Sequence, residues 1–356
     1  MTPLSRLQEA LKPKEFDAVL ISSEINQRYL SDFSFSDGYV LVTSDAAFLL
    51  TDPRYAEAAR AQVSDFIVLI PQMRMLEAVA ELIRANGISR VAIEENALSY
   101  ADFGRFSESL PCTLVPGASA ILGDLRRQKS PEELSRIARA QRITDDAFSH
   151  ILNFISPSVT ERDVALELEY FMRRQGAEGV AFETIAVSGT ASSRPHGEPR
   201  DVKLEQGFLT MDFGARVDGY CSDMTRTVVI GHADDEMKKV YQIVLEAQKA
   251  ALEFLAEGVL CREVDTVARR VITDAGFGAY FTHSLGHGIG MLVHESPSFS
   301  RLAPDDSRLC RGHVMSVEPG IYLEGRFGVR IEDMIAVEHD GNIRNFTQSP
   351  KELIVL

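Results

Sequence analysis

Two apolar runs joined by the dipeptide Asp218-Gly219 constrain the fold of this chain more than any other feature. The runs are FLTMDFGARV and YCSDMTRTVVI, and an Asp-Gly pair between such runs favours a two-residue β-hairpin turn. If this dipeptide forms the turn, Asp223 lies opposite Gly214, two residues from Asp212 on the same face of the sheet. The hairpin therefore predicts two neighbouring carboxylates within reach of one cation.

A structural role for these aspartates is the alternative. Aspartate also caps turns, and Asp223 could pair with Arg226, three residues further along the chain. Two carboxylates held close together repel and shift each other's pKa unless a cation lies between them. The hairpin alone does not distinguish a metal site from a structural role, so further candidate ligands are needed.

A glycine-rich stretch, residues 283–295, contains three of the eight histidines: His283, His287 and His294. The interleaved glycines argue against a helical HxxxH zinc pair and favour an extended backbone that approaches a site closely. In extended form His283 and His287 share a face, and His294 can reach back over a substrate. A single histidine here would more often be a packed core residue, but three together indicate function.

Two glutamates lie in strand-like settings, Glu318 in SVEPG and Glu332 in VRIED. An unpaired charge in an apolar strand costs on the order of several kcal/mol, so each glutamate predicts a cationic partner, either a metal ion or Arg330. Four carboxylates and one imidazole suit Mn²⁺, Co²⁺ or Zn²⁺ better than a thiolate site does. Two such ions about 3.5–4 Å apart can activate a water molecule, which predicts hydrolysis.

Composition excludes several other classes of function. The net charge of −15 disfavours nucleic-acid binding, because such a surface repels phosphates. The four cysteines are widely spaced without a CxxC pair, as in reduced cytoplasmic proteins. The amphipathic stretch 1–16 is interrupted by prolines and lacks a signal core, and no apolar run approaches the ~18 residues of a membrane span. We expect a cytoplasmic protein without membrane or nucleic-acid partners.

A length of 356 residues fits two domains, which we expect at 1–125 and 126–356. The first alternates helices with strands expected at 18–22, 39–43, 47–50, 66–70 and 91–93, which predicts an α/β domain with a mixed sheet. The second opens on a capping pattern, Ser130-Pro131-Glu132-Glu133, and a weaker one follows at 160–163. Its hairpins and its helices, expected at 237–257 and 261–275, indicate an α+β domain.

The order of the five candidate ligands resembles that of the pita-bread metallopeptidases, which include methionine aminopeptidase, Xaa-Pro aminopeptidase and prolidase. The stretches MDFGA, CSDMTRT, HSLGHGIG, SVEPGIY and GVRIED are similar to the five ligand motifs of that family. In the first domain, NQRYL and LTDPRY resemble the N-terminal domain of the proline-specific branch. The resemblance implies a C-terminal pita-bread catalytic domain after an N-terminal α/β domain of the creatinase/prolidase type.

The resemblance also implies a ligand set for two divalent ions, Mn²⁺ or Co²⁺, with Zn²⁺ as a further possibility. By analogy Asp212 and Glu332 bridge the two ions. Asp223 then completes one site, and His287 with Glu318 completes the other.

Roles in substrate binding follow from the resemblance as well. His196, in RPHG, matches a histidine near the scissile bond, and His294 matches one that contacts the substrate carbonyl. Glu318 matches a proton shuttle as well as a ligand. Three further residues match positions that shape the substrate pocket or orient ligands: His283, Tyr322 and Arg330.

The substrates implied are short proline-containing peptides, and a homodimer is expected from the family. A dipeptidase should read a free carboxylate, ideally with arginine, but Ser298 stands where several prolidases carry one, and Arg301 is three residues on. Arg54 or Asp37 of the first domain, from a neighbouring subunit, is an alternative that would limit substrate length. We expect an Xaa-Pro dipeptidase; an Xaa-Pro aminopeptidase, a metal-free creatinase-like enzyme and a non-catalytic binding module are the alternatives.

Overall fold

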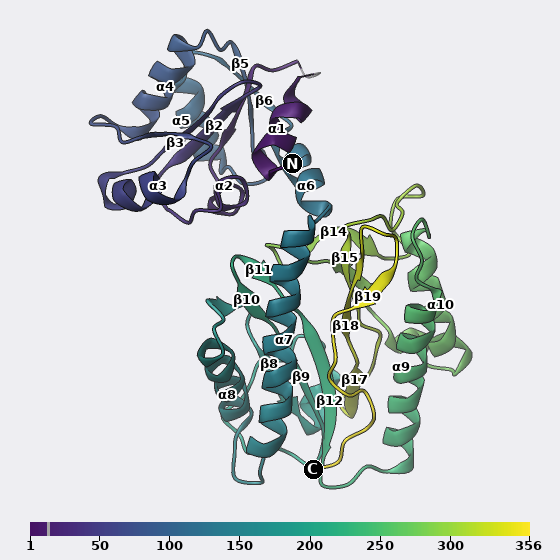
Figure 1. Ribbon diagram of the computed structural model, residues 1–356. Coiled ribbons are helices and arrows are strands. Elements are labelled where there is room, and N and C mark those ends of the chain that lie inside the picture. Colours follow the sequence, from purple (N-terminus) through teal and green to yellow (C-terminus); the bar gives the residue numbers. More distant parts are fainter. Residues whose placement is uncertain (13–14) are drawn as a thin grey trace. The chain divides into compact units, whose positions relative to one another are not determined.

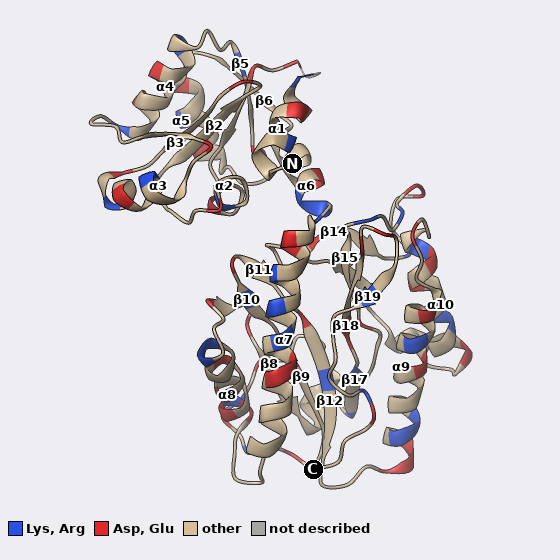
Figure 2. Cartoon of the chain, in the orientation of Figure 1, with Lys and Arg blue, Asp and Glu red and all other residues tan. Residues whose placement is uncertain are grey.

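The computed structural model describes residues 1–12 and 15–356, which form two compact units, Met1–Arg126 and Arg127–Leu356 (Figure 1). Acidic and basic side chains both occur along the surface helices of the second unit (Figure 2). Every helix within the described ranges is too short or too polar to cross a membrane.

The first unit contains the expected mixed sheet, with strand order β4-β3-β2-β1-β5-β6. The central strand β1 runs antiparallel to β2 and parallel to β5. The strands are β1 Ala18–Ile21, β2 Tyr39–Thr43, β3 Ala47–Leu50, β4 Ile67–Leu69, β5 Arg90–Ile93 and β6 Thr113–Pro116. The five expected strands lie within one residue of these bounds, whereas the partly exposed β6 was not expected.

Six helices accompany this sheet: α1 Pro3–Leu11, α2 Glu24–Ser31, α3 Ala56–Gln62, α4 Met75–Ala85, α5 Tyr100–Ser109 and α6 Ala118–Arg127. Buried residues of α4 and α5, such as Val79 and Phe106, pack against Leu20 and Leu41 of the sheet. Helix α1 accounts for most of the expected amphipathic stretch, whose second proline, Pro13, lies outside the described residues.

The second unit is built from four long helices and several small antiparallel sheets. The helices are α7 Pro131–Phe154, α8 Glu161–Arg174, α9 Asp235–Phe254 and α10 Cys261–Asp274. Ser130 and Thr160 each form a capping box, as their sequence patterns predict. The helices α7 and α8 pack on β9 and β12, while α9 and α10 pack on β15, β17 and β18 (Figure 1).

The strands of this unit form sheets of the orders β11-β10-β7, β12-β9-β8, β14-β13-β15-β18-β19 and β16-β17. Their bounds are β7 Gly179–Val180, β8 Ile185–Ser188, β9 Gly207–Phe213, β10 Ala215–Val217, β11 Tyr220–Cys221, β12 Met224–Ile230, β13 Gly286–Gly288, β14 Glu295–Phe299, β15 Val314–Val317, β16 Gly320–Leu323, β17 Phe327–Arg330, β18 Asp333–Val337 and β19 Ile343–Asn345. The combination of mixed first unit and α+β second unit confirms the predicted fold class.

The expected hairpin is present in the predicted register. Val217 pairs with Tyr220 next to the turn, and Asp212 pairs with Thr225 further along the arms. Asp218 and Gly219 of the turn adopt φ values of 48° and 84°, the left-handed conformation that a two-residue hairpin turn requires. The arms are not continuous, however: each is interrupted once, so β9 and β12 belong to one sheet and β10 and β11 to another.

Candidate metal centre and substrate cavity

The interrupted hairpin brings Asp212 and Asp223 to the same cavity. Asp212 lies in β9, and Asp223 lies in the link between β11 and β12. Gly214 allows the arms to approach at this point, because a Cβ atom there would lie 1.9 Å from the carbonyl oxygen of Ser222. The local fold thus provides two carboxylates on one side of the sheet, as the register predicts.

His287 and Glu318 lie on neighbouring segments, His287 in β13 and Glu318 directly after β15. The Nε2 atom of His287 lies 3.2 Å from Oε1 of Glu318 and 3.7 Å from Oδ2 of Asp223. Ser316 links the two segments, because its hydroxyl accepts the backbone N–H of His287 at 3.0 Å and donates to the Glu318 carboxylate at 3.0 Å. The histidine therefore lies on extended backbone rather than on a helix.

Glu332 lies in the short link between β17 and β18 and not inside a strand. Its side chain is buried, and its Oε2 atom accepts a hydrogen bond of 2.8 Å from the Thr225 hydroxyl. Within the described residues, its other oxygen and Oδ1 of Asp212 are buried without a hydrogen-bond partner. Buried acceptors of this kind are unfavourable unless a ligand or ion satisfies them.

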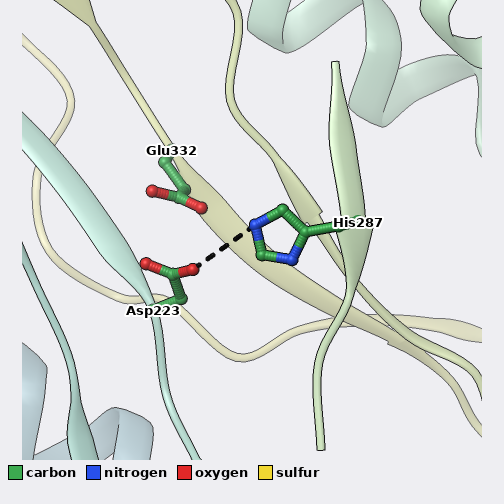
Figure 3. Close-up of side chains that lie close together, drawn as sticks. All are labelled: Asp223, His287 and Glu332. Atoms are coloured by element: carbon green, nitrogen blue, oxygen red, sulfur yellow. Dashed lines mark ion pairs between the residues drawn. The ribbon is translucent and has the colours of Figure 1, made fainter. Parts of the chain in front are cut away.

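Asp223, His287 and Glu332 point toward one another from three separate segments (Figure 3). One ligand atom from each lies within 4.8 Å of the other two. Burial raises the pKa of the Asp223 carboxyl well above its usual value, and neighbouring carboxylates, led by that of Glu332, raise it further. Burial likewise raises the pKa of Glu332. A divalent cation would relieve this repulsion and satisfy the orphaned oxygens, so the residues present fit a metal centre.

Glu318 differs electrostatically from its two carboxylate neighbours. Burial alone would raise the pKa of Glu318, but the adjacent His287 imidazole outweighs this effect and holds the pKa at about 2. Burial alone would lower the pKa of His287, whereas its hydrogen bond with Glu318 raises it. A carboxylate that stays ionised beside a cavity can bind a cation or accept a proton.

A buried arginine connects the ligand set to the substrate side of the cavity. Arg330 donates to Asp212 Oδ2 at 2.6 Å and to the Tyr322 hydroxyl at 2.9 Å. That hydroxyl is 2.9 Å from Nε2 of His283, whose Nδ1 donates to the Ser284 carbonyl. Burial lowers the pKa of His283 and raises that of Tyr322 to about 12. Both side chains therefore stay neutral near pH 7, with the tyrosine donating to the histidine.

The two arginines considered as ion-pair partners for the candidate ligands, Arg226 and Arg330, pair with other carboxylates than those expected. Arg330 pairs with Asp212 and not with either glutamate, because it projects across to β9. Arg226 pairs with Asp333 at 2.8 Å, and both side chains are fully buried. The arginine alternative for Asp223 is therefore wrong.

The five candidate ligands line a cavity of about 520 Å³, which His196 and His294 also line. The His287 and His294 rings lie 4.3 Å apart, centre to centre. Both His196 and His294 are exposed. The His294 ring is nevertheless partly buried, and this burial, with the nearby His287, lowers the pKa of His294. Phe182, Ile185 and Val293 contribute apolar side chains to the lining of the cavity. The volume suits a small ligand with both polar and apolar parts.

Sequence reasoning missed two supporting hydroxyls, those of Thr225 and Ser316. Thr225 lies directly opposite Asp212, so the predicted register already placed it on the ligand face. Ser316 lies two residues before Glu318, and strand alternation would have placed both side chains on one face. No comparable signal pointed to Phe182 or Val293.

Of the residues considered for binding a substrate carboxylate, some line the cavity and others do not. Ser298 lines the cavity, whereas Arg301 is absent from its described lining. In the first unit, the guanidinium of Arg54 lies between Asp37 and Asp52 on an exposed surface. Arg330 supplies the one lysine or arginine among the described lining residues of the cavity.

The sequence also matches known protein families over both units. Residues 135–339 match the model of metallopeptidase family M24, and residues 3–128 match the creatinase/prolidase N-terminal domain. An uncharacterized peptidase of Bacillus subtilis is 41% identical, with 99% of each chain covered. An Xaa-Pro dipeptidase structure from Bacillus anthracis has a TM-score of 0.95 at 39% identity, covering 99% of both chains.

A third relative is the X-Pro aminopeptidase structure from Thermotoga maritima, with a TM-score of 0.91, 37% identity and coverage of 98% of this chain and 100% of the other. All three relatives are described as peptidases, which disfavours a non-catalytic binding module. With its two family domains in this order, the chain belongs to metallopeptidase family M24, the pita-bread family, and is a prolidase-like enzyme.

Proposed function

We propose that this enzyme hydrolyses the peptide bond before proline in Xaa-Pro dipeptides, using two divalent metal ions. The observation that carries the proposal is the convergence of buried carboxylates with His287 on one cavity, where two carboxylate oxygens lack any other partner among the described residues. The likeness to the Bacillus anthracis Xaa-Pro dipeptidase supports the choice of substrate.

In this proposal the two ions would be held by Asp212, Asp223, His287, Glu318 and Glu332. Divalent ions in such a set lower the pKa of a bound water and polarise a carbonyl group. Mn²⁺ or Co²⁺ suits the mixture of hard oxygens and a single imidazole, with Zn²⁺ as a further possibility.

The remaining side chains bind substrate and move protons. Glu318, which lines the cavity, would accept a proton from the nucleophilic water. His294 and His196, both exposed in the cavity wall, contact the substrate carbonyl and the region of the scissile bond. His283, Tyr322 and Arg330 shape the pocket for the proline ring, where the tertiary amide offers no N–H for recognition.

One observation favours a second candidate, an Xaa-Pro aminopeptidase that acts on longer peptides. Arg330 already donates to Asp212, Tyr322, Thr225 and the Pro195 carbonyl, so it is committed within the protein. The carboxylate of a dipeptide would then find no uncommitted arginine among the described residues that line this cavity. A longer peptide carries its carboxylate elsewhere and avoids this cost.

A hydrolysis panel tests both candidates. Met-Pro, Leu-Pro, Ala-Pro-Ala and Met-Ala-Ser are incubated with the enzyme in Mn²⁺ and in EDTA, and the released amino acids are quantified. The dipeptidase proposal predicts Mn²⁺-dependent cleavage of Met-Pro and Leu-Pro only. Equal cleavage of Ala-Pro-Ala would favour the aminopeptidase, and cleavage of Met-Ala-Ser alone would contradict proline specificity.

A cytoplasmic location and a homodimeric state complete the proposal. The four cysteines are unpaired in the structure, as expected in a reducing compartment. Fractionation of the native cells and light scattering of the purified protein test these two points. Enzyme in the secreted fraction, or a monomeric mass, would contradict them.

A further inference from the structure

The loop that carries His196, residues 194–200, is attached to the site at its start. It follows the 3₁₀ turn η2, Gly189–Ser193, and lacks regular secondary structure. The carbonyl of Pro195 accepts a hydrogen bond of 3.2 Å from Arg330. This bond ties the start of the loop to Arg330, but it does not fix where the following His196 ring points.

The end of the same loop is attached to a carboxylate outside the cavity. Arg200 forms a bidentate pair with Glu161 at the start of α8, with Nε to Oε2 at 2.8 Å and Nη2 to Oε1 at 2.6 Å. The backbone N–H of Arg200 donates to the same carboxylate at 3.0 Å. The Glu161 side chain is fully buried, so this charge depends on Arg200 for compensation.

Glu161 also holds the segment that enters the loop. Its Oε1 atom accepts the backbone N–H and the hydroxyl of Ser188, both at 2.7 Å, where β8 ends. Burial alone would raise the pKa of Glu161, but Arg200 and Ser188 outweigh it and lower the pKa. One buried carboxylate thus anchors both ends of residues 188–200, with His196 between the two anchors.

We infer that Glu161 and Arg200 are positioning residues for His196, acting through the loop that they anchor. This inference rests on the proposed function, in which His196 contacts the substrate. His196 is exposed and forms no hydrogen bond of its own in the described structure, so its direction depends on the backbone that carries it. Loss of the bidentate side-chain contact leaves the end of that backbone held by fewer bonds, namely the Arg200 N–H to Glu161 and the Arg162 N–H to the Arg200 carbonyl. Misplacement of a contacting group by about 1 Å can cost on the order of 100-fold in rate.

A double-mutant cycle separates positioning from general stability. We compare kcat/KM for Leu-Pro in wild type, Arg200→Lys, His196→Ala and the combination, all loaded with Mn²⁺. Lysine keeps the charge but loses the bidentate geometry, which limits the risk of misfolding. The inference predicts a loss of about 10–100-fold for Arg200→Lys in wild type. In the His196→Ala background the same change should cost less than about threefold, because its target is gone.

Arg311→Lys, in the exposed pair with Glu257, is the matched control and should leave kcat/KM unchanged. Equal losses from Arg200→Lys in both backgrounds, or a parallel fall in Mn²⁺ content, would overturn the positioning role. If wild type cleaves no Xaa-Pro peptide, the proposed function fails first. Hydrogen exchange then decides the inference separately: Arg200→Lys should speed amide exchange in residues 188–200 and not in 285–290, and unchanged exchange would refute it.

Discussion

Replacing His313 by glutamine is expected to flatten the pH dependence of stability. His313 is 4% exposed, and its Nδ1 atom accepts the backbone N–H of Cys310 at 3.2 Å, a bond that requires an unprotonated nitrogen. Burial, with the nearby charges of Lys129 and Arg127, lowers the pKa of His313 to about 4. The folded protein therefore resists protonation of this ring.

The sign and size of the effect follow from linkage. The unfolded chain binds a proton on this ring near its ordinary pKa of about 6.5, whereas the folded chain does so only near 4, so unfolding takes up a proton between these values. Stability from this group is fully present above about pH 6.5 and is lost as the pH falls toward 4. Between pH 7 and pH 5 the loss is about 2 kcal/mol.

Urea unfolding followed by circular dichroism at pH 7 and pH 5 measures this difference. Titrating carboxylates affect wild type and His313→Gln alike, so the gap between the two proteins isolates the histidine. The gap should shrink by about 2 kcal/mol at pH 5. His232→Gln, at an exposed position, is the control. A gap that stays constant within about 0.5 kcal/mol would refute the reasoning.

Three other predictions concern the second unit. Lys129→Met removes the ammonium group that lies 3.2 Å from the buried Glu295 carboxylate and should lower the free energy of unfolding by about 3–5 kcal/mol. Adding Glu295→Gln should recover part of this loss in urea titrations, and no recovery would contradict a stabilising buried pair. Gly214→Ala places a Cβ atom against the Ser222 carbonyl, which would separate the arms that carry Asp212 and Asp223. Mn²⁺ binding measured by calorimetry should therefore be abolished, and a wild-type affinity would contradict this prediction. Thr225→Val removes the hydroxyl that donates to Glu332, a candidate ligand, and should weaken Mn²⁺ binding by about 10–100-fold. The melting temperature serves as the control for folding, and an unchanged Mn²⁺ affinity would contradict the prediction.

The parts of the fold set by local rules could be predicted from the sequence. The hairpin register follows from one Asp-Gly turn, since pairing on both arms is then counted from it. The starts of α7 and α8 follow from Ser130 and Thr160, because capping involves only residues three positions apart. The interruption of the hairpin arms could not be predicted, because it depends on packing between sheets.

The candidate site could be predicted from the sequence to a similar extent. Alternation on strands put Asp212 and Asp223 on one face, and a charge in an apolar strand drew attention to Glu332. Pairings between distant segments could not be predicted. No local sequence pattern links Arg330 to Asp212, which lies 118 positions earlier in the chain. The Glu161 anchor belongs to the same class, because its partners come from segments joined only in the folded chain.

Anomalous diffraction at the manganese edge, from crystals grown in Mn²⁺, tests whether five side chains hold two divalent ions. We expect two anomalous peaks per chain, both within coordination distance of the set Asp212, Asp223, His287, Glu318 and Glu332. A map with no peak, or with a single peak outside this set, would contradict it.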